Sequence, residues 1–276
     1  MQEHIINKYF RPGRLPHIWC PGCGNGIILG SIAKAIDKLG LDQDTTSIVS
    51  GIGCSSRSSG YLDFNTVHTA HGRALTFATG IKLAKPDLNV IVCTGDGDAT
   101  AIGGNHFIHA ARRNIDLTVI LFNNNIYGMT GGQYSPMTPP NSKATTAPYG
   151  TIEPAFDIVN LAKGAGATFI ARTTTYHAQQ MVEMIAQAIK HPGFALVEVI
   201  TSCPISFGRQ NKLGEAPQMM TWYKNNAVMV GPAWDRLSEE DKQVKMPIGV
   251  LSKTEGVPEY TAQYDKLIER ATGGKK

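Results

Sequence analysis

The sequence is poor in charge and has no concentrated patch of basic residues. Asp, Glu, Lys and Arg make up 17% of its 276 residues, below the roughly 25% that is usual for globular proteins. The formal net charge is +4, and the 26 Lys and Arg residues are scattered along the chain. A protein that binds nucleic acid usually concentrates such residues on one face. We therefore expect no nucleic acid among its partners.

Long apolar segments are also missing. The chain has no run of about 18 apolar residues, so no membrane-spanning helix is predicted. Residues 1–10 lack the apolar core of a secretory signal. These absences predict a cytoplasmic protein with no membrane partner, in a compartment where thiols stay reduced. The five cysteines are then expected to be metal ligands, catalytic groups or core residues before they are disulfides.

The first two-thirds of the chain alternate between helical and extended patterns. Four segments carry apolar residues at helical spacing and are predicted helices: 24–39, 73–85, 100–113 and 177–190. Four short apolar runs are predicted strands: 46–50, 88–94, 117–122 and 194–200. This alternation predicts an α/β fold with a doubly wound, mostly parallel sheet.

The periodicity fades after residue 204. We therefore expect a main domain over 1–205 and an irregular C-terminal extension over 206–276, wrapped around a partner or around the same core. A long polar loop over 133–154 contains five prolines. A loop of that length inside a compact domain is usually functional.

Two polar motifs each follow a predicted buried strand. Gly-Asp-Gly-Asp occupies 95–98, and Asn-Asn-Asn-Ile-Tyr-Gly occupies 123–128. Ligands of such sheets lie beyond the carboxyl ends of the strands, so both motifs should face one crevice. Mg²⁺ prefers oxygen ligands in octahedral geometry with phosphate as a co-ligand. The carboxylate of Asp96, the amide of Asn124 and the carbonyl of Ile126 would supply three of the ligands.

This pair of motifs resembles the diphosphate-binding motif of thiamine-diphosphate enzymes. The alternative is a tight turn with asparagines at a strand end, which a lone Gly-Asp-Gly would not exclude. A nicotinamide-type site is not predicted, because no G-x-G-x-x-G opens a helix after a strand with an acid about twenty residues further on.

Four cysteines form a second set of candidate ligands. Cys20 and Cys23 form a C-x-x-C pair, and Cys54 and Cys203 each follow a predicted strand end. Four thiolates suit either a structural zinc ion or a [4Fe–4S] cluster. A thioredoxin-like redox pair is disfavoured because no strand precedes the motif. Cys93 lies inside an apolar run and is expected to be a core residue.

Taken together, the motifs resemble those of the β subunits of 2-oxoacid:ferredoxin oxidoreductases over roughly residues 10–230. The shared segments are CPGCG, GIGCSS, HGRA, TGDGD, NNNIYGMTGGQ and SCP. The resemblance implies a [4Fe–4S] cluster on Cys20, Cys23, Cys54 and Cys203, and Mg²⁺ on Asp96, Asn124 and Ile126. It implies thiamine diphosphate contacts at Ile52, Gly53, Cys54, Ser55, His71, Gly72, Arg73, Gly97, Asp98, Gly128 and Met129. No residue is assigned to catalysis, although His71 and Arg73 are candidates.

The family reaction is oxidative decarboxylation of a 2-oxoacid with coenzyme A, with electrons passed to ferredoxin, or its CO₂-fixing reverse. The thiazolium ylid attacks the keto carbon, and the ring then acts as an electron sink. Thiamine enzymes activate the cofactor with a Glu from a second, related domain. The chain has room for one such domain, so an α subunit must supply the Glu, by analogy in a dimer of heterodimers.

The substrate expected from the resemblance is 2-oxoglutarate. Residues 127–133 match members that act on 2-oxoglutarate and some that act on branched-chain 2-oxoacids, and 207–214 are similar to the 2-oxoglutarate type. Pyruvate or a branched-chain 2-oxoacid is the first alternative. Two further alternatives are a non-redox thiamine decarboxylase half-subunit with a zinc site, and a non-catalytic iron–sulfur scaffold.

Overall fold

The computed structural model describes residues 4–273. Residues 1–3, part of the segment expected to lack a secretory signal, and residues 274–276, the end of the expected extension, lie outside the described residues. The elements follow in this order: α1 (Ile5–Tyr9), α2 (Asn25–Leu39), β1 (Thr46–Ser50), η1 (Ser55–Gly60), β2 (Asn65–His68), α3 (Ala74–Ala84), β3 (Asn89–Gly95), α4 (Asp96–Thr100), α5 (Gly104–Arg112), β4 (Leu117–Asn123), α6 (Ile158–Ala165), β5 (Phe169–Thr174), α7 (Ala178–Lys190), β6 (Phe194–Ile200), η2 (Pro204–Gly208), α8 (Ala216–Asn226), β7 (Ala227–Met229), α9 (Pro232–Asp235), α10 (Glu239–Val244), β8 (Met246–Lys253) and α11 (Tyr260–Ala271).

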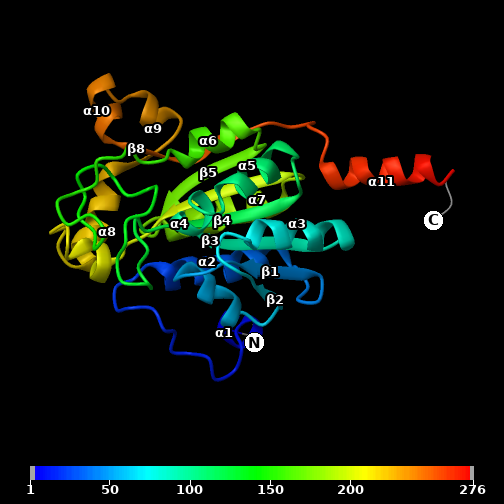
Figure 1. Cartoon of the computed structure of the whole chain (residues 1–276), viewed down its shortest axis with the longest axis horizontal. Helices are drawn as coiled ribbons and strands as arrows, with labels where there is room; N and C mark the ends of the chain where they lie inside the picture. Colours follow the sequence, from blue (N-terminus) through cyan, green and yellow to red (C-terminus); the bar gives the residue numbers. More distant parts are fainter. Residues whose placement is uncertain (1–3, 274–276) are drawn as a thin grey trace.

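The strands form one twisted sheet in the order β2-β1-β3-β4-β6-β5-β8-β7 (Figure 1). Neighbouring strands are parallel, except that β8 runs antiparallel to β5. The chain moves outward from β1 toward β2 and in the other direction toward β3 and β4. This reversal of strand order opens a crevice at the carboxyl ends of β1 and β3. The predicted α/β fold with a doubly wound, mostly parallel sheet is confirmed.

The central strands are buried on both faces by helices. On one face α2 and α7 pack together over the sheet, and their apolar residues form one core cluster. On the other face α3, α5 and α6 enclose a second cluster. Strand β4 is buried along its whole length. Continuous apolar strands are what two covered faces require.

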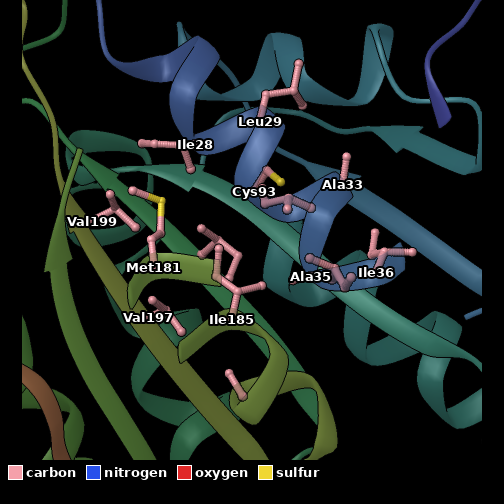
Figure 2. Packing of buried hydrophobic residues seen from close by; sticks show 14 of the residues in the cluster. Ile28, Leu29, Ala33, Ala35, Ile36, Cys93, Met181, Ile185, Val197 and Val199 are labelled. Atoms are coloured by element: carbon pink, nitrogen blue, oxygen red, sulfur yellow. The ribbon is translucent and has the colours of Figure 1, made fainter. Parts of the chain in front are cut away.

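The packing of α2 shows how the sequence pattern produces this layer. Ile28, Ile32 and Ile36 are fully buried because positions four apart fall on the same side of a helix. Figure 2 shows this face of α2 lying against Met181 and Ile185 of α7. Burying a side chain of this size contributes roughly 1.5–3 kcal/mol. The helix therefore anchors the segment that precedes it, which carries two of the cysteines.

Most predicted elements agree with the structure to within one or two residues. The helix expected over 100–113 is the exception, because it divides into α4 and α5 with a break at 101–103. A side chain at Gly103 would lie 2.3 Å from the carbonyl oxygen of Asp98 and 3.2 Å from the Cα of Gly72. The break lets the turn at Gly72 approach the Gly-Asp-Gly-Asp segment. β2, α6 and β5 were not predicted from the sequence.

The prediction of an irregular extension was wrong in its local structure. Residues after 205 form α8, β7, α9, α10, β8 and α11, and β8 joins the main sheet beside β5. Helix α11 extends away from the body of the molecule (Figure 1). Among residues 4–273, no helix has both the length and the apolar character needed to cross a membrane. The proposed boundary at 205/206 stays a prediction.

Candidate active site

A crevice lies beyond the carboxyl ends of β1, β3 and β4. Its walls come from the loop after β1, the turn before α3, the start of α4 and the loop after β4, with one residue from α2. The lining residues are Asn25, 52–55, His71, 95–98, Phe122, Asn124 and 126–130. The two polar motifs and Cys54 therefore face one space, as the order of the predicted strands requires.

Asp96 is the first residue of α4 and is 3% exposed. Its Oδ2 accepts a hydrogen bond of 2.6 Å from the hydroxyl of Ser135, in the long proline-containing loop. Burial raises the pKa of Asp96 to about 7, against the lowering effect of its hydrogen bonds. Burial disfavours the ionised form of this carboxylate. A bound cation would stabilise the ionised form.

The loop after β4 brings more oxygen atoms to the same place. The side chain of Asn124 is buried, and its Oδ1 accepts the backbone N–H of Ile126 at 3.3 Å. Asn125 has a left-handed backbone, with φ of 61°, and its carbonyl accepts the hydroxyl of Thr138 at 2.6 Å. The loop is thus held in a sharply turned form, a conformation that non-glycine residues rarely adopt.

One carboxylate, one amide oxygen and the backbone of the turned loop fit a hard divalent cation. Such ions take oxygen ligands, and Mg²⁺ commonly uses one or two carboxylates with phosphate oxygens. The carboxylate of Asp96 and the amide of Asn124 line the crevice together with Ile126. This end of the crevice can therefore hold a metal ion together with an anionic ligand.

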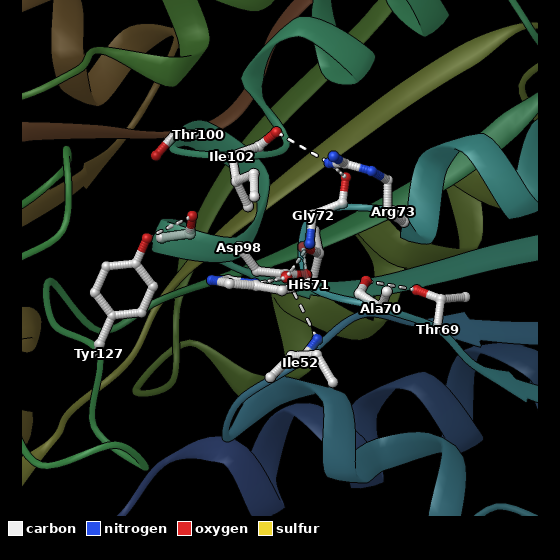
Figure 3. Close-up of polar contacts among 12 residues, drawn as sticks. Ile52, Thr69, Ala70, His71, Gly72, Arg73, Asp98, Thr100, Ile102 and Tyr127 are labelled. Atoms are coloured by element: carbon white, nitrogen blue, oxygen red, sulfur yellow. Dashed lines mark hydrogen bonds and ion pairs between the residues drawn. The ribbon is translucent and has the colours of Figure 1, made fainter.

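Asp98 has a different environment, although it stands only two residues further on. Its Oδ1 accepts the backbone N–H of Gly72 at 2.7 Å and that of Ile52 at 3.3 Å. The same oxygen accepts a hydrogen bond from Nδ1 of His71. Its Oδ2 accepts the hydroxyl of Thr94 at 2.8 Å. Figure 3 shows the contacts from Ile52, His71 and Gly72 meeting at the carboxylate.

Two of the expected cofactor residues do not line the crevice. Gly72 and Arg73 lie beside it, where the guanidinium of Arg73 donates to the carbonyls of Gly72 and Ile102 at 3.4 and 3.3 Å. Arg73 is the N-cap of α3, the surface role that its sequence position alone would allow. The other expected residues of this set do line the crevice. Their roles as cofactor contacts stay predictions.

The four candidate cysteine ligands approach one another from three parts of the chain. Cys20 is exposed, whereas Cys23, Cys54 and Cys203 are half-buried. Burial, followed by the other cysteines, raises the pKa of Cys23 to about 12 and that of Cys54 to about 11. The backbone N–H groups of Asn25 and Met129 hydrogen-bond to Cys23 and Cys54 and act in the opposite direction.

Gly128 lies between the two ends of the crevice. A Cβ built on this residue would be 3.5 Å from the sulfurs of both Cys54 and Cys203, and 3.8 Å from the amide nitrogen of Asn124. The two thiols and the side chain of Asn124 therefore border the same small space. Among residues 4–273, no three His, Cys, Asp or Glu side chains converge closely enough to hold a single metal ion.

Cys93 is separate from this set. It is fully buried among apolar residues of the core cluster between α2, α7 and the sheet (Figure 2). Burial raises the pKa of its thiol to about 12. The sequence-based assignment of Cys93 as a core residue is confirmed.

The structure also reveals polar residues that the sequence analysis missed. Asn25 is 1% exposed and lines the crevice, and within the described chain neither polar atom of its side chain has a hydrogen-bond partner. Tyr127 donates its hydroxyl to the carbonyl of Gly97 at 2.9 Å. Ser135 binds Asp96 from a distant loop. A signal existed for Asn25, which follows the CPGCG segment, and for Tyr127, which lies within the 123–128 motif.

Comparison with known proteins agrees with this geometry. The family "Thiamine pyrophosphate enzyme, C-terminal TPP binding domain" matches residues 51–199, which include both polar motifs. The class defined by the fold and the crevice is therefore that of thiamine pyrophosphate enzymes.

More specific relatives match almost the whole chain. The 2-oxoglutarate synthase subunit KorB of Methanocaldococcus jannaschii is 52% identical over 97% of this chain and 98% of its own. The subunit of the same name from Methanothermobacter thermautotrophicus is 53% identical over 99% of this chain and 94% of its own.

A solved structure matches along the full length as well. It is that of a 2-oxoglutarate:ferredoxin oxidoreductase from Magnetococcus marinus with 2-oxoglutarate, coenzyme A and succinyl-CoA bound. It has a TM-score of 0.88 and 36% identity, and the match covers 100% of this chain and 93% of that one. The chain belongs to the family of 2-oxoacid:ferredoxin oxidoreductase β subunits, of the 2-oxoglutarate synthase KorB type.

Proposed function

We propose that the chain is the thiamine-diphosphate-bearing β subunit of a 2-oxoglutarate:ferredoxin oxidoreductase. The reaction joins 2-oxoglutarate and coenzyme A to give succinyl-CoA and CO₂, and passes two electrons singly to ferredoxin; the reverse reaction fixes CO₂. The relatives named for 2-oxoglutarate, and the solved structure that holds 2-oxoglutarate, coenzyme A and succinyl-CoA, support this substrate over pyruvate or branched-chain 2-oxoacids.

The observation that carries the proposal is the crevice with oxygen ligands at one end and cysteine sulfurs at the other. Asp96 and Asn124 stand at one end, and Cys54 and Cys203 border the same space at Gly128. A thiamine enzyme that oxidises its substrate needs an electron acceptor close to the cofactor. The closeness of the candidate acceptor cysteines to the crevice supports this proposal.

Each end has a separate task in this proposal. Asp96, Asn124 and the carbonyl of Ile126 hold Mg²⁺, which neutralises the diphosphate of the cofactor. Cys20, Cys23, Cys54 and Cys203 hold a [4Fe–4S] cluster. Bound thiamine diphosphate supplies the electron sink for decarboxylation. The chain itself positions the anion, excludes water from the buried carboxylate and keeps the sulfurs beside the reaction.

The four cysteines favour a cluster over a zinc ion. Zinc has no redox chemistry, whereas a thiamine enzyme that oxidises its substrate needs an electron acceptor, a role that a cluster fills. Thiolates are required in both cases, so the compartment must keep the cysteines reduced. The cytoplasm meets this requirement.

The proposed assembly includes an α subunit and ferredoxin as the electron acceptor. The crevice described above contains no Glu among its lining residues, and thiamine activation in this family needs one. An α partner is proposed to supply it, in a dimer of heterodimers. The chain alone is then expected to bind thiamine diphosphate weakly and to turn over no 2-oxoacid.

The test is co-expression of the chain with its α subunit, followed by assays of acyl-CoA formation over a panel of 2-oxoacids with ferredoxin. The expected result is the highest kcat/KM with 2-oxoglutarate and no turnover by the isolated chain. Visible absorption that bleaches with dithionite should accompany it. Turnover of 2-oxoglutarate without reduction of any acceptor would contradict the redox assignment, and robust oxidation by the isolated chain would contradict the need for a partner.

A further inference from the structure

We propose that Asp98 is a positioning residue, whose carboxylate holds the ring of His71 so that one defined nitrogen faces the cofactor crevice. This inference rests on the proposed role of the crevice as the thiamine diphosphate site. It assigns to Asp98 a task different from direct contact between its side chain and the cofactor.

The first support is the number of donors on a single oxygen. Oδ1 of Asp98 accepts Nδ1 of His71, together with the backbone N–H groups of Gly72 and Ile52 at 2.7 and 3.3 Å. Hydrogen bonds to an ionised acceptor are about twice as strong as those between neutral groups. Asp98 is 3% exposed, so water does not compete for these donors. The carboxylate is thus turned toward protein donors.

The second support is the close approach of the surrounding backbone. A Cβ at Gly51 would lie 1.9 Å from Oδ2 of Asp98, so any side chain there would displace the carboxylate. Gly51 precedes the loop that carries Ile52 and Cys54, and Gly72 follows His71. The carboxylate of Asp98 therefore ties together two loops that both contribute to the wall of the crevice.

The third support is the chemistry of the imidazole. A carboxylate can only accept, so Nδ1 of His71 carries the proton in this contact. The second ring nitrogen has no hydrogen-bond partner among residues 4–273, and the side chain is 39% exposed at the crevice. Figure 3 shows the ring lying between Asp98 and Tyr127. Its Nε2 is the atom left to meet a bound ligand.

This logic parallels the use of a buried Asp to select the tautomer of a catalytic histidine, where replacement by Asn permits the wrong tautomer. Asp98→Asn keeps the shape and leaves an amide oxygen for the two backbone donors. It removes the charge that favours a proton on Nδ1. The substitution should therefore spare the fold and release His71.

The first experiment measures the tautomer by ¹⁵N NMR on the full cofactor-free chain, labelled at its eight histidines. The signals of His71 are identified by their loss in His71→Gln. The expected result is a proton on Nδ1 in the parent chain and a population with the proton on Nε2 in Asp98→Asn. Thr94→Val is the matched control, because it removes the bond to the other carboxylate oxygen and should keep the Nδ1 tautomer.

The second experiment is a double-mutant cycle on thiamine diphosphate affinity in the complex with the α subunit. Asp98→Asn and His71→Gln should each weaken binding by about 10- to 100-fold, the range seen when the partner of a ligating residue is lost. The double variant should be no weaker than the weaker single variant. A cycle isolates such dependence.

The outcomes separate the two proposals. Additive losses, or an unchanged His71 tautomer in Asp98→Asn, would overturn the positioning role. A parent complex that binds no thiamine diphosphate, with the tautomers as expected, would overturn the proposed function and leave the positioning role standing.

Discussion

The two ends of the crevice offer opposite kinds of candidate ligand and are built in different ways. At the oxygen end, Asp96 and Asn124 come directly from the ends of adjacent strands β3 and β4, and both are buried. At the cysteine end, the candidate ligands come from three loops, and Cys20 is exposed. Hard oxygen ligands suit Mg²⁺, and soft thiolates suit iron or zinc. The sheet therefore fixes one end directly, whereas loops must meet to form the other.

The difference indicates which end would depend more on its proposed metal or cluster for a fixed structure. Asp96 and Asn124 follow the paired ends of the adjacent strands β3 and β4, so the sheet itself keeps them near each other. The segment that holds Cys20 and Cys23 has no regular secondary structure before α2 begins at Asn25. Metal–sulfur bonds should thus contribute more to structure at the cysteine end.

The largest expected effect is at that end. Cys203→Ala should remove the iron–sulfur signal and with it all ferredoxin reduction, because a cluster needs its thiolate ligands. Cys93→Ala is the matched control in the same chain, since Cys93 is buried in the apolar core, and it should keep the signal. Iron content and EPR of the reduced complex provide the measurement. A full cluster in Cys203→Ala would remove this residue from the ligand set.

The next largest effect is expected from a substitution that disrupts only the oxygen end. Asp96→Asn should weaken thiamine diphosphate binding by more than about 100-fold, the upper end for losing a residue that merely supports a ligand. The amide keeps the shape but loses the charge that fixes Mg²⁺. High Mg²⁺ and cofactor concentrations should restore part of the affinity, and the cluster should remain. Calorimetric titrations at several Mg²⁺ concentrations test this, and unchanged affinity with unchanged Mg²⁺ dependence would contradict the metal assignment.

The pH dependence of the unfolding free energy should distinguish the two ends of the crevice, because their buried groups act in different pH ranges. In the chain without cofactors, burial raises the pKa of Asp96 from 3.8 to about 7 and that of Cys54 from 9.0 to about 11. Between each pair of values the unfolded chain has released a proton that the folded chain retains. The unfolding free energy should therefore fall as pH rises through each window, by about 1.4 kcal/mol for each pKa unit.

Chemical denaturation at a series of pH values measures these slopes. Asp96→Asn should flatten the lower window and leave the upper one, whereas Cys54→Ala should reduce only the upper slope. Added Mg²⁺ with thiamine diphosphate should also flatten the lower window. Stability that rises from pH 4 to pH 7 in the cofactor-free chain, with Asp96→Asn unchanged from the parent, would refute this account of Asp96.

The smallest expected effect also concerns the oxygen end. Asn124→Ala removes a neutral ligand that water can replace, so thiamine diphosphate affinity should fall by about 10-fold, the low end of the range for such losses. Comparison with Asp96→Asn then separates the effect of losing a charge on cofactor affinity from the effect of losing one ligand. Equal losses in the two variants, measured by the same titration, would show that charge is not the main contribution of Asp96.

The sequence predicted the features that depend on neighbouring residues or on strand ends. Helix 24–39 follows from apolar spacing, and the meeting of Asp96 with Asn124 follows from buried strands that end at each motif. Ser135 could not be found in this way, because its contact with Asp96 spans 39 positions and involves a loop without periodicity. The same is true of the bond between Asp98 and Ile52, which spans 46 positions.

Strands with weak patterns were missed for a related reason. β2 has a partly exposed, polar sequence and pairs only with β1 at the edge of the sheet. β8 joins the sheet antiparallel to β5 with a bulge between Ile170 and Ala171. Strand β8 forms by pairing with the free edge of β5. That edge exists only after the earlier part of the chain has folded.

The long interval between the first and last candidate cysteine ligands has a consequence for the biogenesis of the protein. Cys20 is near the start of the chain, whereas Cys203 follows β6, a strand that pairs between β4 and β5. On a ribosome, the complete set of four thiols exists only after the central sheet has been synthesised and has closed. Iron and sulfide delivered earlier would meet at most three of the four thiols. Assembly of the proposed cluster should therefore wait until Cys203 has been synthesised, and the three early cysteines would need protection from oxidation until then.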